Sequence, residues 1–252
     1  MRRKGPVARG ARSDATCYVM AFDLYVGPAS RYLAQNWKTI GQQYAEEQGY
    51  AFQVVRPQPS VFRRLFGPKP AKSFDAWRAN IAADLVNRGC TDPLWTESPD
   101  GEYFTDRPGW EGHFGLLLLY AYMLKPELTP PTHLPADPAS DTVILDLSSG
   151  PIGNIQHLSH CDIYLPMSFD HMFVGKGLNG GDVAISSLDR LNAALWEVCD
   201  LWGKDRMTMG SQRTDQPASG APLEEAALHG LARYANLTDE ALARRLPLIK
   251  DY

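Results

Sequence analysis

The run from His113 to Lys125 constrains the fold more than any other part of this sequence. Its side chains are apolar almost all round a helix, from Phe114 to Leu124. A helix that is apolar on every side has to be enclosed by other elements. The run is too short to span a bilayer, and Pro126 follows it. We therefore expect one central buried helix near 113–125 with other elements packed around it.

The composition is that of a folded domain preceded by a segment of different composition and charge. The 252 residues are 44% hydrophobic and 21% charged, which is ordinary for a globular chain able to bury a core. Five basic residues and one acid give residues 1–19 a net charge of +4, so that the rest carries −8. We expect 1–19 to be a disordered basic arm and 20–252 to be a single domain. Five prolines between 126 and 138 mark 126–140 as its one candidate seam.

Strand and helix patterns both occur along the domain. Short apolar or alternating runs predict strands at 22–26, 52–55, 143–147, 163–165 and 172–174, and another through Val183 and Ile185. Helical spacing predicts helices over 30–49, 73–89, 113–125 and 186–203, one from Pro222 to about Tyr234, and a short last one capped by Thr238. Residues 91–112 and 204–220 carry neither pattern. The predicted fold class is α/β of the α+β type, a mixed sheet with several packed helices.

The 186–203 helix has the most complete pattern. Ser186 and Asp189 form an S-x-x-D capping sequence, and Gly203 stands where the helix should end. The apolar positions between them step by three and four: Leu188, Leu191, Leu195, Val198 and Trp202. This spacing predicts a core helix.

Charge and cysteine usage narrow the classes of function. An acidic body argues against nucleic acid as a partner and suits a basic protein. The four cysteines are scattered without a CxxC pair, which favours free thiols in the cytoplasm. No apolar segment follows the basic start, so we expect neither a secretory signal nor a membrane span.

A glycine turn suggests one enzymatic alternative. Asp146-Leu-Ser-Ser-Gly150 follows the apolar run 143–147 and is similar to the first motif of S-adenosylmethionine-dependent methyltransferases. That motif needs glycine so that the backbone can approach the ligand. Ser148 stands where that family usually has its first glycine, and about nine residues are too few for a comfortable crossover helix. We expect no binding of this cofactor.

A histidine and cysteine cluster suggests the second alternative. His157, His160 and Cys161 offer the imidazole and thiolate ligands that zinc prefers. No further cysteine pair and no carboxylate at helical spacing completes the set, and the three side chains would diverge on an extended segment. We expect no metal here, with each imidazole held by a local hydrogen bond. The enzymatic alternative, a methyltransferase-like protein or a metal-dependent hydrolase, rests on Asp146, Gly150, His157, His160 and Cys161.

A loop with apolar side chains is the predicted partner surface. Phe62, Leu65 and Phe66 lie within a Pro/Lys/Arg-rich stretch, where exposed apolar side chains often mark a protein contact.

Three segments give the chain a diffuse family resemblance. MAFDLYVG at 20–27, HLSHCDIYLPMSF at 157–169 and ISSLDRLNAALWEVCDL at 185–201 resemble uncharacterised bacterial cytoplasmic proteins of the toxin-immunity type. The resemblance implies a non-enzymatic protein that neutralises a toxin by direct binding. It implies no catalytic residue. From the residues themselves we expect no cofactor and no metal, and the oligomeric state stays open.

Overall fold

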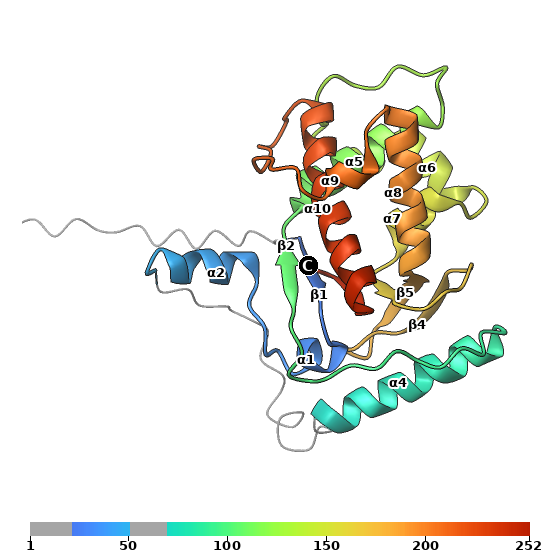
Figure 1. The fold of residues 1–252 in the computed structure, drawn as a ribbon. Helices are drawn as coiled ribbons and strands as arrows, with labels where there is room; N and C mark the ends of the chain where they lie inside the picture. Colours follow the sequence, from blue (N-terminus) through green and yellow to red (C-terminus); the bar gives the residue numbers. More distant parts are fainter. Residues whose placement is uncertain (1–21, 51–69) are drawn as a thin grey trace, which may run out of the picture.

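The computed structural model describes residues 22–50 and 70–252, and within them the predicted fold class is confirmed (Figure 1). A six-stranded mixed sheet has helices packed on both faces. The strands are β1 (Asp23–Val26), β2 (Phe104–Asp106), β3 (Ile163–Leu165), β4 (Phe173–Lys176), β5 (Asp182–Ser187) and β6 (Leu248–Asp251). Their order is β2-β1-β6-β3-β5-β4; β3 and β5 run parallel, and the other neighbouring pairs are antiparallel.

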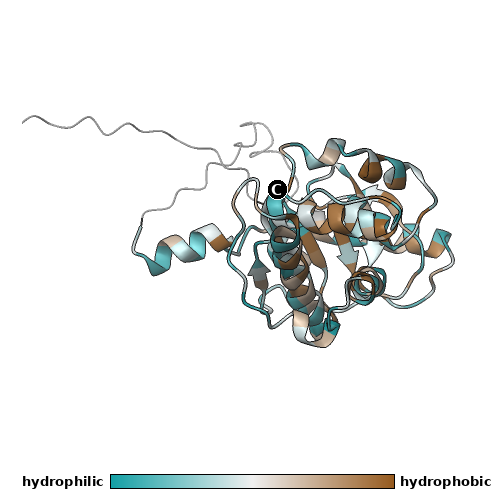
Figure 2. Ribbon diagram, turned by 90° about the horizontal axis from the view of Figure 1, so that it is seen from above, coloured by the Kyte–Doolittle hydropathy of each residue, from teal (hydrophilic) through white to brown (hydrophobic). Residues whose placement is uncertain are grey.

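The helices account for most of the remaining regular structure. They are α1 (Ala29–Leu33), α2 (Ile40–Glu47), α4 (Pro70–Asn87), α5 (Gly109–Met123), α6 (Thr142–Ser149), α7 (Asn154–His160), α8 (Leu188–Trp202), α9 (Arg206–Met209) and α10 (Leu223–Arg244), with a 3₁₀ turn at Pro138–Ser140. Of these, α2 projects from the body of the molecule (Figures 1 and 2).

The sheet separates two hydrophobic cores because successive side chains of a strand point to opposite faces. On one face, Leu24 and Val26 pack with residues of α5, α7, α8 and α10. On the other face, Tyr25 joins the aromatic side chains Trp37, Trp77 and Trp95. All four residues of β1 are buried. The result is a three-layer arrangement with β1 enclosed from both sides.

Helix α5 is the central helix that its composition predicts. It is buried on nearly every side, and it begins at Gly109, four residues before the expected start. Its contact with α10 depends on glycines. A Cβ added to Gly230 would lie 2.1 Å from the carbonyl oxygen of Gly112, and one added to Gly115 would lie 2.7 Å from the Cβ of Ala226. Only the absence of side chains lets the two backbones approach so closely.

Helix α8 confirms the predicted apolar stripe, with a correction at its first residue. Leu188, Leu191, Leu195 and Val198 are buried. Gly203 ends the helix in the left-handed conformation, with φ of 66°. The N-cap is Ser187 rather than Ser186, and its side chain accepts a hydrogen bond from the backbone N–H of Arg190. Ser186 belongs to β5 instead.

Several predicted elements were wrong, and each has a local physical reason. The expected strand 143–147 is helix α6, because Asp141 caps it by accepting from the backbone N–H of Val143. The expected helix 30–49 is two helices, since Thr39 forms a capping box with Gln42 and starts α2 anew. Thr238 does not cap a last helix but lies buried inside the continuous α10.

Boundaries and short elements account for the other differences. Helix α4 begins at Pro70, before the expected cap at Ser73. The segments expected to be irregular contain β2 and α9, and β6 follows α10 without having been predicted. The expected arm 1–19 and strand 52–55 lie outside the described residues. The seam at 126–140 stays a prediction; α5 before it and Val143 after it share one core cluster.

In the part of the chain that the structure describes, no helix is long and apolar enough to cross a membrane.

The burial of α8 leads to a stability prediction. Leu195 has no exposed surface, so Leu195→Ala should lower the free energy of unfolding by about 2–5 kcal/mol, as truncation of a buried leucine does. Denaturant unfolding measures the change. Leu201→Ala is the matched control, since Leu201 lies on the same helix and is exposed. Equal losses for both variants would contradict the assignment of this stripe to the core.

Candidate functional site

The sequence-predicted histidines and cysteine do not face a common space. The segment is helical as far as His160, not extended as expected, and Cys161 is the C-cap of α7. His157 is buried, and its Nδ1 lies 2.6 Å from Oγ of Ser186. Cys161 is buried, whereas His160 is exposed. Among residues 22–50 and 70–252, no group of three or more His, Cys, Asp or Glu side chains is arranged to hold a metal ion.

The buried groups around Cys161 are held in structural roles. Burial raises the pKa of the Cys161 thiol to about 12, so the thiol stays protonated and unreactive at neutral pH. Burial also lowers the pKa of Lys250 to about 8. The Nζ of Lys250 donates to the carbonyl oxygens of Leu158 at 2.8 Å and Ser159 at 3.4 Å. Lys250 thus satisfies carbonyl groups that the end of α7 leaves unpaired.

Ser186 and His157 are the residue types of an activated nucleophile, but a substrate has no access to them. A histidine that contacts a serine hydroxyl is the usual way to activate it as a nucleophile. Ser186, however, has no exposed surface, and the side chain of His157 is also buried. A substrate therefore cannot reach this hydroxyl in the described conformation.

The glycine turn lacks the strand that a cofactor loop needs. Asp146 lies on the exposed side of α6 and pairs with Lys125. Gly150 follows α6 as its C-cap, with φ of −79°. The first methyltransferase motif begins at the end of a buried strand, and α6 replaces that strand here. The signal that could have found the helix is Asp141, an N-cap residue two positions before the run 143–147, whose periodicity alone is ambiguous.

Phe62, Leu65 and Phe66, the predicted partner surface, lie outside the described residues.

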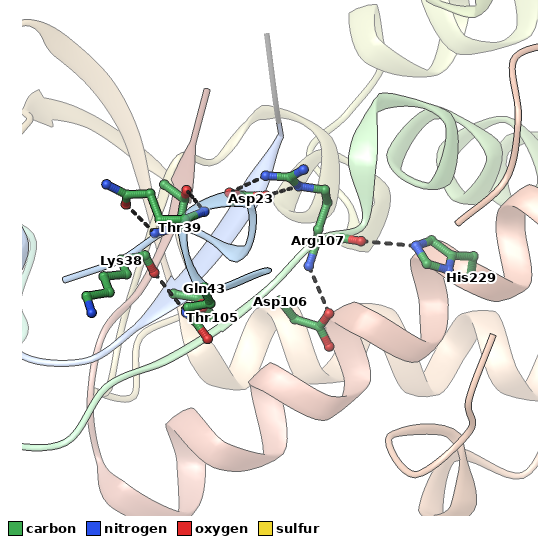
Figure 3. A network of polar contacts seen from close by, with 9 residues as sticks. Asp23, Lys38, Thr39, Gln43, Thr105, Asp106, Arg107 and His229 are labelled. Carbon is green, nitrogen blue, oxygen red and sulfur yellow. Dashed lines mark hydrogen bonds and ion pairs between the residues drawn. The ribbon is translucent and has the colours of Figure 1, made fainter. Parts of the chain in front are cut away.

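A polar network that the sequence did not predict ties β1, β2 and α10 together (Figure 3). Asp23 is fully buried in β1, and its two carboxylate oxygens accept from Nε of Arg107 at 2.6 Å and from Nη2 of Arg107 at 3.1 Å. Such a bidentate pair compensates the cost of burying the carboxylate. Asp106 accepts from the backbone N–H of Arg107 at 2.8 Å and contacts Asn236 and Arg233 of α10.

His229 extends this network from α10. Its Nε2 lies 3.0 Å from the carbonyl oxygen of Arg107, which can only accept, so Nε2 carries the proton. The Nδ1 then accepts from the hydroxyl of Thr214 at 2.9 Å. Burial lowers the pKa of His229, consistent with a neutral ring in this position.

Helix α2 also contacts β2, through the side chain of Gln43. Gln43 donates from Nε2 to the hydroxyl of Thr105 at 2.7 Å and to the carbonyl oxygen of Lys38 at 2.9 Å. Figure 3 draws this contact in the same view as the ion pair of Asp23 and Arg107. The strand β2 is therefore held between α2 and α10 by side-chain hydrogen bonds.

An open groove with a volume of about 440 Å³ lies along α2, β2 and α10. We call it the edge groove, lined by Gln43, Tyr103, Phe104, Thr105, Asn236, Leu237 and Glu240. Most of these side chains can form hydrogen bonds, and the buried Leu237 gives the groove an apolar element. The sequence does not reveal it because β2 is only three residues long and the pattern predicts two helices where α10 is one. The run Tyr103-Phe104-Thr105, aromatic and β-branched, is the one local signal of a strand.

A second cleft of about 470 Å³ lies where the parallel strands β3 and β5 end. It is lined by Asp92, Pro93, Pro166, Met167, Ser168, Leu188, Asp189, Leu242 and Arg245. Ligands of α/β proteins often bind at such strand ends. Among the described residues, no side-chain hydrogen bond or ion pair joins the charged groups of this cleft into a network like that at the edge groove, and so the edge groove is the better candidate.

Comparison with known proteins adds no assignment: no family model, no curated protein and no solved structure matches the chain.

The buried histidines predict how stability depends on pH. His113 contacts the hydroxyl of Tyr234 through Nδ1 at 2.9 Å. Burial, together with the charge of Lys250, lowers its pKa well below 6.5. Below about pH 6.5 this histidine therefore binds a proton in the unfolded chain but not in the folded chain. The free energy of unfolding should fall between pH 7.5 and pH 5, and His113→Asn should reduce that fall.

Denaturant unfolding at the two pH values provides the measurement. The exposed His133 supplies the control, and His133→Asn should leave the pH dependence of the parent protein unchanged. A pH dependence that is equally large with and without His113 would contradict the assignment.

Proposed function

We propose that this chain is a non-enzymatic binding protein of the immunity type, which neutralises a cognate bacterial toxin by direct contact. The observation that carries the proposal is the edge groove, an open surface whose side chains can form hydrogen bonds and which lies on the polar network of β1, β2 and α10. By contrast, the serine, cysteine and lysine that could perform chemistry near His157 are buried and committed to structural contacts. A surface of this kind suits recognition more than catalysis.

The charge supports a basic partner. Residues 20–252 carry a net charge of −8. At the edge groove, Arg244 lies 2.9 Å from both Glu240 and Glu102, so one cation serves two carboxylates. Just before α2, Lys38 pairs with Glu46 of that helix, while Glu47 is exposed next to Glu46. Complementary charge of this kind accelerates the encounter with a basic protein and favours it over acidic ones.

The proposed compartment is the bacterial cytoplasm. Cys90, Cys161 and Cys199 are free thiols in the described residues. Free thiols are usual in a reducing compartment.

The product of the adjacent gene tests the proposal. It should arrest growth when expressed alone, and co-expression of this chain should restore growth. Glu240→Lys reverses a charge in the edge groove and should weaken the purified complex at least tenfold at low ionic strength, because rim charges act mainly through steering.

Asp200→Lys is the matched control. Asp200 is exposed on α8, which does not line the groove, so this variant should bind like the parent protein. An adjacent gene product that is harmless, or that remains toxic in the presence of this chain, would contradict the proposed function.

A further inference from the structure

In residues 22–50 and 70–252, no strand pairs with the outer edge of β2, and the register of the sheet shows which residue has its N–H and carbonyl on that edge. The N–H of Lys250 donates to the carbonyl oxygen of Asp162 at 2.9 Å, so the backbone of Lys250 faces β3. In an antiparallel ladder the hydrogen-bonding side alternates from one residue to the next. Ile249 therefore faces β1, where it stands opposite Tyr25. The backbone of Tyr25 in turn faces β6.

The same alternation applies to the pairing of β1 with β2. Leu24 and Val26 face β2, where they stand opposite Asp106 and Phe104. Thr105 lies between those two residues, so its N–H and carbonyl point away from β1. Within residues 22–50 and 70–252, no backbone hydrogen bond reaches Thr105 from outside the sheet. Among the described residues β2 is the last strand of the sheet order, so this donor and acceptor have no backbone partner there and can pair with another chain.

The edge groove runs along this open backbone. Phe104 and Thr105 are consecutive strand residues whose side chains point to opposite faces of the sheet. Both line the groove, together with Gln43 of α2 and Asn236 of α10. The groove therefore passes the outer edge of β2 rather than lying on one face. It offers an extended chain two backbone bonds at Thr105 and side-chain contacts on either flank.

We propose that an extended, basic segment of the partner adds to β2 as a further strand of the sheet. This inference rests on the proposed function and names the way in which its partner is bound. Main-chain bonds at Thr105 supply affinity, and the alternate side chains of the segment enter the edge groove. The excess of carboxylates at Glu102 and Glu240 over Arg244 selects basic residues at those positions.

A displayed library of random twelve-residue peptides, selected on the full-length protein, tests the inference. Enriched peptides should contain lysine or arginine alternating with β-branched residues. Thr105→Pro removes the outward N–H and, with it, the hydroxyl that accepts from Gln43. The ladder with β1 should stay intact, because proline is tolerated on an edge strand where its missing N–H would face away from the ladder. The variant should weaken the selected peptides at least tenfold, while Thr105→Val, which keeps the N–H and loses the hydroxyl, should retain binding.

A second measurement applies even if Thr105→Pro fails to fold. A selected peptide methylated on the backbone nitrogens along one edge should lose binding, and the same peptide methylated along its other edge should keep it. Equal binding of both peptides would overturn the inference. So would an absence of enriched peptides, binding of the peptides only after residues 1–21 are removed, or a dimer of this chain that occupies the edge.

The outcome is separable from that of the proposed function. A toxin that Thr105→Pro neutralises as well as the parent protein does would refute strand addition and leave the immunity role intact.

Discussion

The close contact between α5 and α10 is the constraint on which the rest of the structure depends. Gly112, Gly115 and Gly230 let the two helices approach until backbone touches backbone. This contact fixes α10 against the central helix and presents His229, Arg233 and Asn236 to the segment around β2. A side chain at Gly230 would separate the helices, because its Cβ would fall 2.1 Å from a carbonyl oxygen. The residues of α10 would then no longer line the edge groove.

The polar network then fixes the positions of β2 and of the side chains that line the edge groove. Asp23 is buried in β1, and without Arg107 its carboxylate would lose the bidentate partner that compensates its burial. Because the carbonyl of Arg107 also accepts from His229, the position of β2 is coupled to α10 as well as to β1. Such coupling holds Thr105 and its neighbours in place without a ligand. A preformed surface of this kind reduces the entropy lost on binding.

The sequence predicted the long elements and missed the short, non-local ones. All-round apolarity identified α5, and three-four spacing identified α8, since both signals are local. The strands β2 and β6 contain three and four residues, and their pairing with β1 joins segments far apart in the chain. Thr238 carries a local preference for a helix cap, but burial inside α10 overrides it. The edge groove was beyond prediction because it depends on the register of β2 and on α10 being continuous.

Hydrogen exchange at the amide of Thr105, measured in the free protein and in the complex with the adjacent gene product, tests the central claim most directly. The amide has no backbone partner in the described residues and should exchange rapidly in the free protein. Strand addition should slow it at least tenfold in the complex, whereas the amides of Phe104 and Asp106, which face β1, should be slow in both states. An amide of Thr105 that exchanges equally fast with the proposed partner bound would contradict recognition through the edge of the sheet.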